Sequence, residues 1–336
     1  MGRRRGPKAK SSPLSAPLPP LLEASTLGGG GGEEGEEEEE EASEVWKPYQ
    51  CKSIAFGEKH PGSLVEGAAL AAIELPPNSY PLQDSLGFQI QTGRLSSMQL
   101  EGVMYACERH SRKLPGGARA GFLLNDSAGV GKGRQVAGII VDNLVRARPR
   151  HVWFSVSKDL HLDASRDFQD LGCTVQVIPS VAKLTTTKTD SNGSVVFCTY
   201  TELISKGRAK SNDTRYDELV DWLCGGKTPE LRENFDGCLI FDESHKAKNV
   251  VEGKKESTAV SSKTGELVVR IQTDLPNARV VYSSATGIIG IESMGYLVRM
   301  GLWGVKIHHF ERLETFGIVL GVAKGMQDLV HWKCLL

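Results

Sequence analysis

Short apolar runs alternate with amphipathic stretches through the central part of the chain. The apolar runs are rich in Val, Ile, Leu and Phe and predict strands at 120–125, 151–157, 173–178, 194–200, 237–243 and 278–285. Stretches with helical spacing of apolar positions predict helices at 131–147, 159–171, 214–224, 264–274 and 291–301. Such runs are typical of strands buried on both faces, so the pattern predicts an α/β domain with a mainly parallel sheet covered by helices on both faces.

One further helix is predicted ahead of the first strand, within residues 95–114. The apolar residues of its helical stripe are Met98, Val103, Met104, Tyr105 and Cys107, and Ser96 or Ser97 provides a suitable N-cap. The preceding segment, 45–95, contains several prolines and shows little periodicity, so we expect an extended, partly ordered lead-in. The folded domain is therefore expected to span 96–304.

The first 44 residues differ in composition from the rest of the chain. A Pro/Ser-rich stretch is followed by a run of glycines and then by an acidic block. Such a segment cannot bury enough apolar surface to offset its ordering entropy, so we expect it to be disordered. This tail holds ten Glu against five Lys or Arg, whereas the whole chain has a formal net charge of −1, so the remainder is mildly basic. A mild excess permits contact with polyanions without requiring it.

Other features of the composition exclude some classes of protein. Seven cysteines are scattered without a CxxC pair, which argues against a structural zinc site and fits free thiols in a reducing compartment. No apolar run reaches the length of a membrane span. The basic start "MGRRRGPKAK" is not followed by an apolar stretch, so a secretory signal is not expected. "RRRGPKAK" fits either a nuclear localisation signal or a solvated basic tail.

The stretch 122–140, "FLLNDSAGVGKGRQVAGII", combines a strand, a small-residue loop and a helix. Ligands of parallel sheets bind at the carboxyl ends of the strands, where this loop lies. Gly129 and Gly131 allow backbone N–H groups to approach phosphate oxygens, and Lys132 would reach the β- and γ-phosphates at the helix N-terminus. The predicted phosphate-binding set is Ala128, Gly129, Val130, Gly131, Lys132, Gly133 and Arg134.

Two later strands also end in suggestive residues. "FDESH" places Asp242 where it could hold Mg²⁺ and Glu243 where it could orient or deprotonate the attacking water. "SSATG" forms a small-residue turn after another strand. Taken singly, Lys132 fits a surface lysine, the two carboxylates fit a polar strand end, and His245 fits a core or surface histidine. Their order, each at a strand end, favours an ATP site.

The motifs resemble those of known ATPases. "LNDSAGVGKG", "FDESH" and "SSAT" are similar to motifs I, II and III of superfamily 2 helicases with a DExH box. More closely, "AGVGKGR", "WFSVSKDLHLDASRDFQDLG", "FDESHKAKN" and "MGYLVRMGLWG" resemble the strawberry notch family over roughly residues 45–304.

This resemblance implies a RecA-like P-loop lobe that binds ATP and Mg²⁺. "LSSMQLEGV" would place Gln99 against the adenine, and Asp242, Glu243 and His245 would form the catalytic set. His245 and the turn Ser284, Ala285 and Thr286 would couple the site to a second lobe. The family is taken to regulate transcription and chromatin in the nucleus, with a cytoplasmic location as the alternative.

Some positions depart from common patterns. Gly133 stands where P-loops usually carry Ser or Thr; the resembled family shows the same glycine, so a water or another group is expected to fill that position around Mg²⁺. Asn125, Ser127 and Gln135 differ from the family loop, which puts turnover more in question than binding. The segment 305–336 loses the resemblance and is too short for a second lobe, so we expect an apparently truncated chain with slow or no ATP hydrolysis.

Two other interpretations remain open. A non-catalytic interaction module could keep the fold and use ATP at most as a structural ligand. A P-loop kinase or GTPase is the other, and the sequence shows no base-recognition motif of that class.

The expected partners are ATP, transcription proteins and weakly bound DNA, RNA or chromatin, without a membrane. The basic residues considered for nucleic-acid contact, or as solvated loop charges, are Lys158, Lys206, Arg208 and Lys210.

Overall fold

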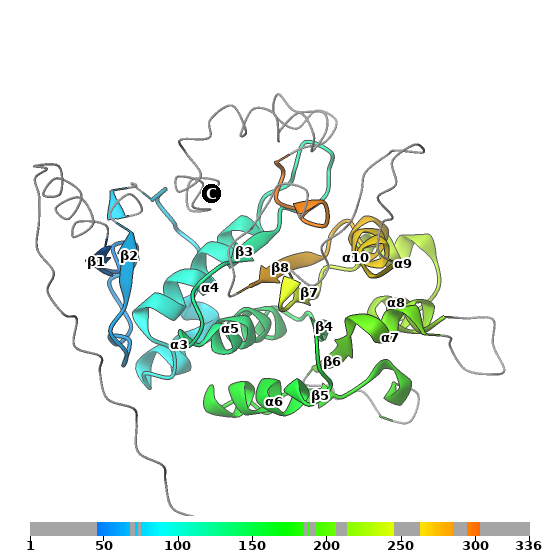
Figure 1. Cartoon of the computed structure of the whole chain (residues 1–336), viewed down its shortest axis with the longest axis horizontal. Coiled ribbons are helices and arrows are strands. Elements are labelled where there is room, and N and C mark those ends of the chain that lie inside the picture. The colour runs from blue at the N-terminus through cyan, green and yellow to red at the C-terminus, as the bar shows by residue number, and fades with distance from the viewer. Residues whose placement is uncertain are drawn as a thin grey trace, which may run out of the picture. The chain divides into compact units, whose positions relative to one another are not determined.

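A computed structural model of the chain describes residues 46–67, 71–72, 75–184, 187, 193–205, 214–244, 263–284 and 294–302 (Figure 1). All of these belong to one unit, Val45–Leu336. The predicted tail, 1–44, and the divergent segment, 305–336, lie outside the described residues.

Six parallel strands form the central sheet in the order β3-β8-β7-β4-β6-β5. The strands are β3 (Phe122–Leu124), β4 (Arg150–Ser155), β5 (Gln176–Ile178), β6 (Ser194–Thr199), β7 (Cys238–Phe241) and β8 (Arg279–Ser283). Each matches one of the predicted apolar runs, with β4 beginning one residue before its run, so the predicted parallel sheet is confirmed.

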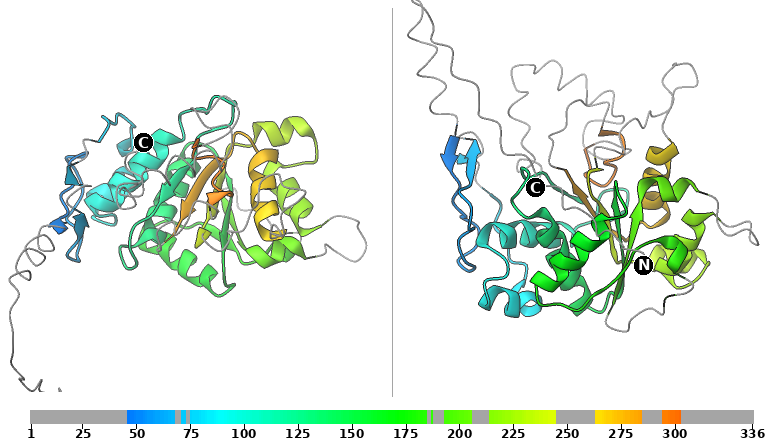
Figure 2. Two further views of the ribbon diagram at one scale, coloured as in Figure 1. Left: turned by 45° about the horizontal axis from the view of Figure 1, so that its top comes forward. Right: turned by 60° about the horizontal axis from the view of Figure 1, so that its bottom comes forward.

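Helices cover both faces of this sheet (Figure 2). One face carries α3 (Gln83–Gln91), α4 (Ser97–Arg109), α5 (Lys132–Val145) and α6 (Leu160–Asp170). The other face carries α7 (Tyr200–Ile204), α8 (Arg215–Cys224) and α10 (Lys263–Asp274), with the short α9 (Pro229–Asn234) packed beside α8. In the described part of the chain, no helix combines the length and apolar character that crossing a bilayer requires.

The two hydrophobic cores follow from the alternation of side chains along each strand. In β4, Val152 and Phe154 enter the core beneath α7, α8 and α10, whereas Trp153 enters the core beneath α4, α5 and α6. All three are at most 4% exposed. Burying one such side chain contributes about 1.5–3 kcal/mol, so both faces of every central strand stabilise the sheet.

Aromatic side chains form a continuous row across one face of the sheet. Phe154 stacks on Tyr200 and on Phe241, with ring centroids 6.1 and 5.2 Å apart. Phe241 in turn stacks on Tyr282, which meets Tyr296 edge to face at centroid distances of 5.8 and 5.9 Å. Because Phe154, Phe241 and Tyr282 come from adjacent strands at one level, their contacts require a single strand register.

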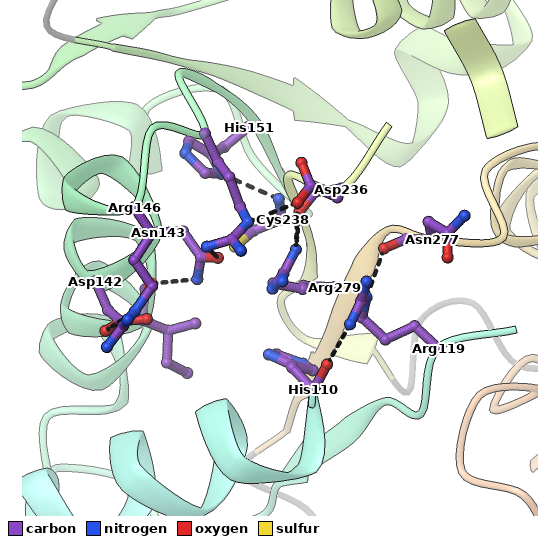
Figure 3. Close-up of polar contacts among 12 residues, drawn as sticks. His110, Arg119, Asp142, Asn143, Arg146, His151, Asp236, Cys238, Asn277 and Arg279 are labelled. Atoms are coloured by element: carbon purple, nitrogen blue, oxygen red, sulfur yellow. Dashed lines mark hydrogen bonds and ion pairs between the residues drawn. The ribbon is translucent and has the colours of Figure 1, made fainter. Parts of the chain in front are cut away.

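The amino ends of the strands carry a partly buried polar layer (Figure 3). Asp236 accepts from Arg148 at 2.7 Å and from Arg279 at 3.2 Å. The backbone N–H of Cys238 donates to Nδ1 of His151 at 3.0 Å, and burial lowers the pKa of His151 to about 3. A neutral imidazole with an accepting nitrogen is therefore built into the sheet.

A second contact joins α4 to this layer. The ring of His110 meets the carbonyl of Val280 at 3.0 Å, and burial lowers its pKa to about 3. Arg119 donates to the carbonyls of His110 and Asn277, at 2.6 and 2.8 Å (Figure 3). These contacts connect the end of α4 to β8 and to the turn before it.

Several elements differ from the sequence expectation. The lead-in contains α3 and an antiparallel pair, β1 (Trp46–Pro48) and β2 (Val65–Gly67), so it is more ordered than expected. The helix predicted at 291–301 is wrong for 294–302, which form turns. Gly301 has a left-handed φ of 75°, and tertiary contacts of Arg299 replace helical bonds there.

Arg299 fixes these turns to the rest of the domain. Its guanidinium donates to the carbonyls of Arg119 and Pro276, at 2.9 and 2.8 Å, and of Leu275 at 2.8 Å, as well as to Gln272. The side chain is buried, with Arg299 only 3% exposed. Two of these carbonyls belong to the end of α10, where a positive charge is favourable.

Replacing Arg299 with Met should lower the free energy of unfolding by about 2–4 kcal/mol, because several buried carbonyls lose their donor. Chemical denaturation measures the change. Arg166→Met is the matched control, since that side chain is 62% exposed and its ion-pair partner Asp163 is also exposed; it should change stability by less than about 0.5 kcal/mol. Equal losses in the two variants would contradict the assigned role.

Candidate active site

Three adjacent strands end at the same level of the sheet. β7 lies between β4 and β8, and its next residue, Asp242, is level with Ser155 of β4 and Ser283 of β8. Ser155 Oγ donates to Asp242 Oδ2 at 3.2 Å, and Ser283 Oγ donates to Oδ1 at 3.1 Å. One hydroxyl from each neighbouring strand therefore orients the carboxylate predicted to hold Mg²⁺.

The environment of Asp242 opposes its negative charge. Burial raises the pKa of Asp242, the Ser283 and Ser155 hydroxyls lower it, and the adjacent Glu243 raises it further. A cation at this position would offset both the desolvation and the repulsion between the carboxylates. This chemistry fits a divalent metal, whose other ligands in nucleotide sites are phosphate oxygens and water.

The phosphate-loop candidate connects β3 to α5. Gly129 and Gly131 both adopt left-handed φ values, 86° and 78°, which a side chain would strain. Ser127, Ala128 and Gly129 are exposed at the crest of the loop, whereas Val130 is buried. The loop therefore turns its small residues outward directly before the N-terminus of α5, as phosphate binding requires.

Lys132 is the first residue of α5 and lies over the loop. Its ammonium donates to the carbonyls of Asp126 and Ser127, at 2.7 and 2.9 Å. Burial lowers the pKa of Lys132, and the carboxylates of Asp126, Glu243 and Asp242 oppose this change. The lysine and the two carboxylates at the end of β7 therefore share one electrostatic environment.

Gln99 holds the loop from the side of α4. Its Oε1 accepts from the backbone N–H of Ser96, and its Nε2 donates to the carbonyl of Val130 at 3.1 Å and that of Gly131 at 3.5 Å. The side chain is 5% exposed, and a Cβ on Gly131 would lie 2.3 Å from it. The structure thus gives Gln99 contacts with the loop backbone; its contact with adenine stays a prediction.

The backbone after β7 is unusual at Glu243. Its φ of 49° is left-handed, which is uncommon outside glycine and clusters at functional sites. The turn is supported on both sides, because Tyr200 Oη donates to the carbonyl of Asp242 at 2.8 Å and Tyr296 Oη donates to Ser244 Oγ at 3.2 Å. Hydrogen bonds of the two adjacent residues, Asp242 and Ser244, therefore hold Glu243 in its left-handed conformation.

The other predicted site residues lie in several places. Arg134 pairs with Asp170 of α6 at 2.5 Å, beside the loop. Ser284 donates its backbone N–H to the carbonyl of Leu124 at 3.1 Å, which links the end of β8 to β3. Lys158 is exposed after β4. The residues that lie outside the described part of the chain are His245, Ala285, Thr286, Lys206, Arg208 and Lys210.

Sequence reasoning missed the hydroxyls of Ser155 and Ser283 and the tether from Gln135. Both serines end apolar strand runs, which is a weak signal until the strand order is known. Gln135 is fully buried, and its Nε2 donates to Asp126 Oδ2 at 2.8 Å. Gln135, which differs from the family pattern, therefore holds the start of the loop.

Within the described ranges, no cluster of three or more His, Cys, Asp or Glu could hold a metal.

The carboxylate of Asp167 lies beside the glycine that follows Lys132. A Cβ on Gly133 would lie 2.1 Å from Oδ2 and 3.0 Å from Cγ of Asp167 on α6. The carboxylate of Asp167 thus occupies space that a Ser or Thr side chain would need. Burial raises the pKa of Asp167 to about 6, and Arg166 and Arg134 oppose this shift.

The chain is similar to known proteins over most of its length. A family model described as P-loop containing NTP hydrolase pore-1 matches residues 59–324. Protein strawberry notch of Drosophila melanogaster is 41% identical over 270 residues, covering 78% of this chain and 16% of that protein. Strawberry notch homolog 1 of Gallus gallus is 43% identical over 270 residues, covering 78% and 21%. Protein FORGETTER 1 of Arabidopsis thaliana is 40% identical over 294 residues, covering 86% and 22%.

Among solved structures, the SWI2/SNF2 ATPase core of Sulfolobus solfataricus in complex with dsDNA is similar, with a TM-score of 0.43 and 13% identity. The match covers 75% of this chain and 42% of that one. Against the relatives named above, the chain spans 16–22% of their length.

A double-mutant cycle between Gly133 and Asp167 should reveal their steric conflict. Gly133→Ala alone should fail to give the gain of about 0.5–1 kcal/mol that Gly→Ala normally brings inside a helix. In an Asp167→Ala background the same change should give that gain, a coupling of about 1 kcal/mol or more. Gly138 of the same helix is less suitable as a control, because its neighbours are core side chains. Additive effects in urea denaturation would rule out the conflict.

Proposed function

The chain belongs to the strawberry notch family of P-loop NTP hydrolases, and on this basis we propose that it is the ATP-binding, helicase-like lobe of such a protein. Phosphate binding would use the loop before α5, and Mg²⁺ binding would use Asp242. The observation that carries the proposal is the geometry at the carboxyl ends of β4, β7 and β8, where two serine hydroxyls hold Asp242. The negative charges of Asp242 and Glu243 act on the ammonium of Lys132.

Each residue would have a distinct part in nucleotide binding. The exposed backbone at Ala128 and Gly129 and the N-terminus of α5 would contact phosphate oxygens, and Lys132 would leave the loop carbonyls to meet them. Asp242 would hold Mg²⁺ with its carboxylate fixed by two hydroxyls. The metal would neutralise phosphate charge. Because Gly133 has no hydroxyl, water would fill the Mg²⁺ coordination position that a Ser or Thr usually takes.

Hydrolysis would depend on Glu243 and on a positive charge from elsewhere. Glu243 stands beside Asp242 at the end of β7, where a carboxylate can orient a water molecule. Arg134, the arginine nearest the loop in the chain, is held by Asp170 at 2.5 Å. We therefore expect slow or no turnover by this chain alone, because a transition-state arginine contributes about 10³–10⁵ in rate.

The role of the whole protein is a wider proposal. We infer a nuclear regulator of transcription or chromatin, supported by the basic stretch 3–10 and by family membership. Weak, salt-dependent contact with nucleic acid would use exposed basic residues such as Lys158 after β4. A protein-interaction module without catalysis is the alternative, and the absence of ATP binding would favour it.

Lys132→Ala should weaken Mg-ATP binding about 10- to 100-fold, equivalent to ~1.4–2.7 kcal/mol, because the ammonium no longer meets the phosphates. Titration with a fluorescent ATP analogue measures the affinity. Lys158→Ala is the matched control, since this exposed lysine follows β4, which β8 and β7 separate from β3, and its loss should leave the affinity unchanged. Unaltered binding in Lys132→Ala, with the unfolding midpoint also unaltered, would refute the phosphate-loop assignment.

Glu243→Gln separates ATP binding, measured by the same titration, from ATP hydrolysis, measured by phosphate release. This variant should bind Mg-ATP as well as the unmodified chain, because phosphate contacts and the carboxylate of Asp242 remain. Phosphate release, measured after adding the second lobe of a longer family member, should rise for the unmodified chain and not for Glu243→Gln. Brisk turnover by the single chain that survives the substitution would show that Glu243 has no catalytic part.

The proposed location has its own test. A fluorescently tagged chain should accumulate in the nucleus, and replacement of Arg3, Arg4 and Arg5 by Ala should reduce that accumulation by removing the basic cluster. Replacing the acidic block instead serves as the control. A cytoplasmic distribution of the unmodified chain would contradict the proposal.

A further inference from the structure

A short hairpin between α4 and β3 holds two cations side by side. Lys113 and Arg119 lie directly opposite each other in an isolated antiparallel bridge. The turn is closed by two backbone hydrogen bonds of 2.8 Å, from the N–H of Leu114 to the carbonyl of Ala118 and from the N–H of Gly117 to the carbonyl of Leu114. Like charges directly opposite each other destabilise a pair of strands, so an anion between the two side chains would stabilise the hairpin.

Both cations also contact Asn277, two residues before β8. Arg119 Nε donates to the carbonyl of Asn277 at 2.8 Å (Figure 3), and the ammonium of Lys113 donates to Oδ1 of the same residue. The amide of Asn277 is fixed in turn, because its Nδ2 donates to the carbonyl of Glu233 at 2.6 Å. Lys113, Arg119 and Asn277 therefore form one compact group, the hairpin cluster, at the amino ends of β3 and β8.

The hairpin cluster keeps hydrogen-bond donors available for a ligand. Within the described residues, the ammonium of Lys113 uses one of its three donors. Arg119 uses Nε for Asn277 and Nη1 for the carbonyl of His110, at 2.8 and 2.6 Å, and the described structure shows no hydrogen bond of its Nη2. A carboxylate in front of the hairpin can therefore accept from both side chains.

The described residues place no carboxylate in an ion pair with either cation of the cluster. Burial, followed by the charge of Arg279, lowers the pKa of Arg119 to about 10, against the opposing charge of Asp236. Asp236 already accepts from two other arginines, at 2.7 and 3.2 Å. Desolvation also lowers the pKa of Lys113, and the charges of Arg119, Arg299 and Arg279 lower it further. An added negative group would relieve this repulsion.

The tip of the hairpin is open to a partner. Lys113, Pro115, Gly116 and Gly117 are exposed. A Cβ on Gly116 or Gly117 would meet no described atom within 4 Å. Gly117 has a left-handed φ of 86°, which lets the turn close without a side chain. A peptide can therefore approach the two cations across small residues.

Carboxylates around the cluster favour a peptide over a nucleic acid. Glu108 pairs with Arg112 at 3.6 Å at the end of α4, and Glu233 is exposed beside Asn277. The side chain of Asp236 is 42% exposed. A nucleic-acid backbone carries a charge at every nucleotide and would meet these carboxylates, whereas a peptide can place its acidic residues at the two cations alone.

We propose that the hairpin cluster binds an acidic segment of a partner protein, with Asp or Glu carboxylates accepting from Lys113 and Arg119. The exposed tip, 115–117, would lie along the bound segment. This surface is at the amino ends of β3 and β8, whereas the proposed nucleotide site is at the carboxyl ends of the strands. Peptide binding is therefore expected with or without Mg-ATP.

Anisotropy of a fluorescent peptide of alternating Glu and Gly residues, added to the full chain, tests this surface. The unmodified chain should bind the peptide at submillimolar concentration, and more weakly as salt rises. Lys113→Gln should weaken binding about threefold or more, and Lys113→Glu about tenfold or more, because attraction is first lost and then replaced by repulsion. Lys227→Gln is the matched control, since it removes the same charge from a lysine that is 67% exposed but paired with Asp221.

Asn277→Asp tests the same cluster from the side of β8. This variant places a carboxylate against both cations and should weaken peptide binding about tenfold, because the added charge occupies the place of the peptide's carboxylate. An unaltered unfolding midpoint in each variant reports that the domain persists.

Several results would overturn the proposal. Equal losses in Lys113→Glu and Lys227→Gln, or no binding of the peptide at millimolar concentration, would show that the hairpin is no acidic-peptide site. Tighter binding of single-stranded DNA of equal charge, lost in Lys113→Glu, would assign the surface to nucleic acid. Peptide binding that appears only after the eight Glu within 33–41 are replaced by Gln would assign it to the chain's own acidic block.

Discussion

The common register of β4, β7 and β8 is the constraint on which the candidate site depends. One level of these strands places Phe154, Phe241 and Tyr282 in a stacked row. The next level is polar and holds Asp242 between two serine hydroxyls. A slip of one residue would exchange the faces of every side chain, bury the carboxylate among helices and separate the rings. The register set by the stacked rings therefore also positions Asp242 between the two serine hydroxyls.

The two ends of the sheet use polar residues in opposite ways. At the amino ends, Asp236 is neutralised by two arginines, and His151 is held neutral by burial. At the carboxyl ends, Asp242 and Glu243 are adjacent, and Lys132 donates to the carbonyls of Asp126 and Ser127. Compensated charges stabilise a fold, whereas two adjacent carboxylates repel each other and would be stabilised by a cation.

The loop itself depends on contacts from three helices. Gln99 of α4 binds its last carbonyls, Gln135 of α5 binds Asp126 at its start, and Asp167 of α6 fills the space beside Gly133. Positions that look like defects in a phosphate loop are therefore matched by partners elsewhere. These contacts fix the shape of the loop, which would lower the entropic cost of the proposed phosphate binding.

Local patterns in the sequence were sufficient for the strands, most of the helices, the glycine loop and the carboxylates after β7, because apolar periodicity and turn chemistry act over a few residues. They could not identify Ser155 and Ser283 as partners of Asp242, which requires that β7 lie between β4 and β8. Nor could they reveal the conflict between Gly133 and Asp167, since two packed helices bring those residues together. Strand order and helix packing are set by burial of both sheet faces across the whole chain, so only the tertiary structure decided them.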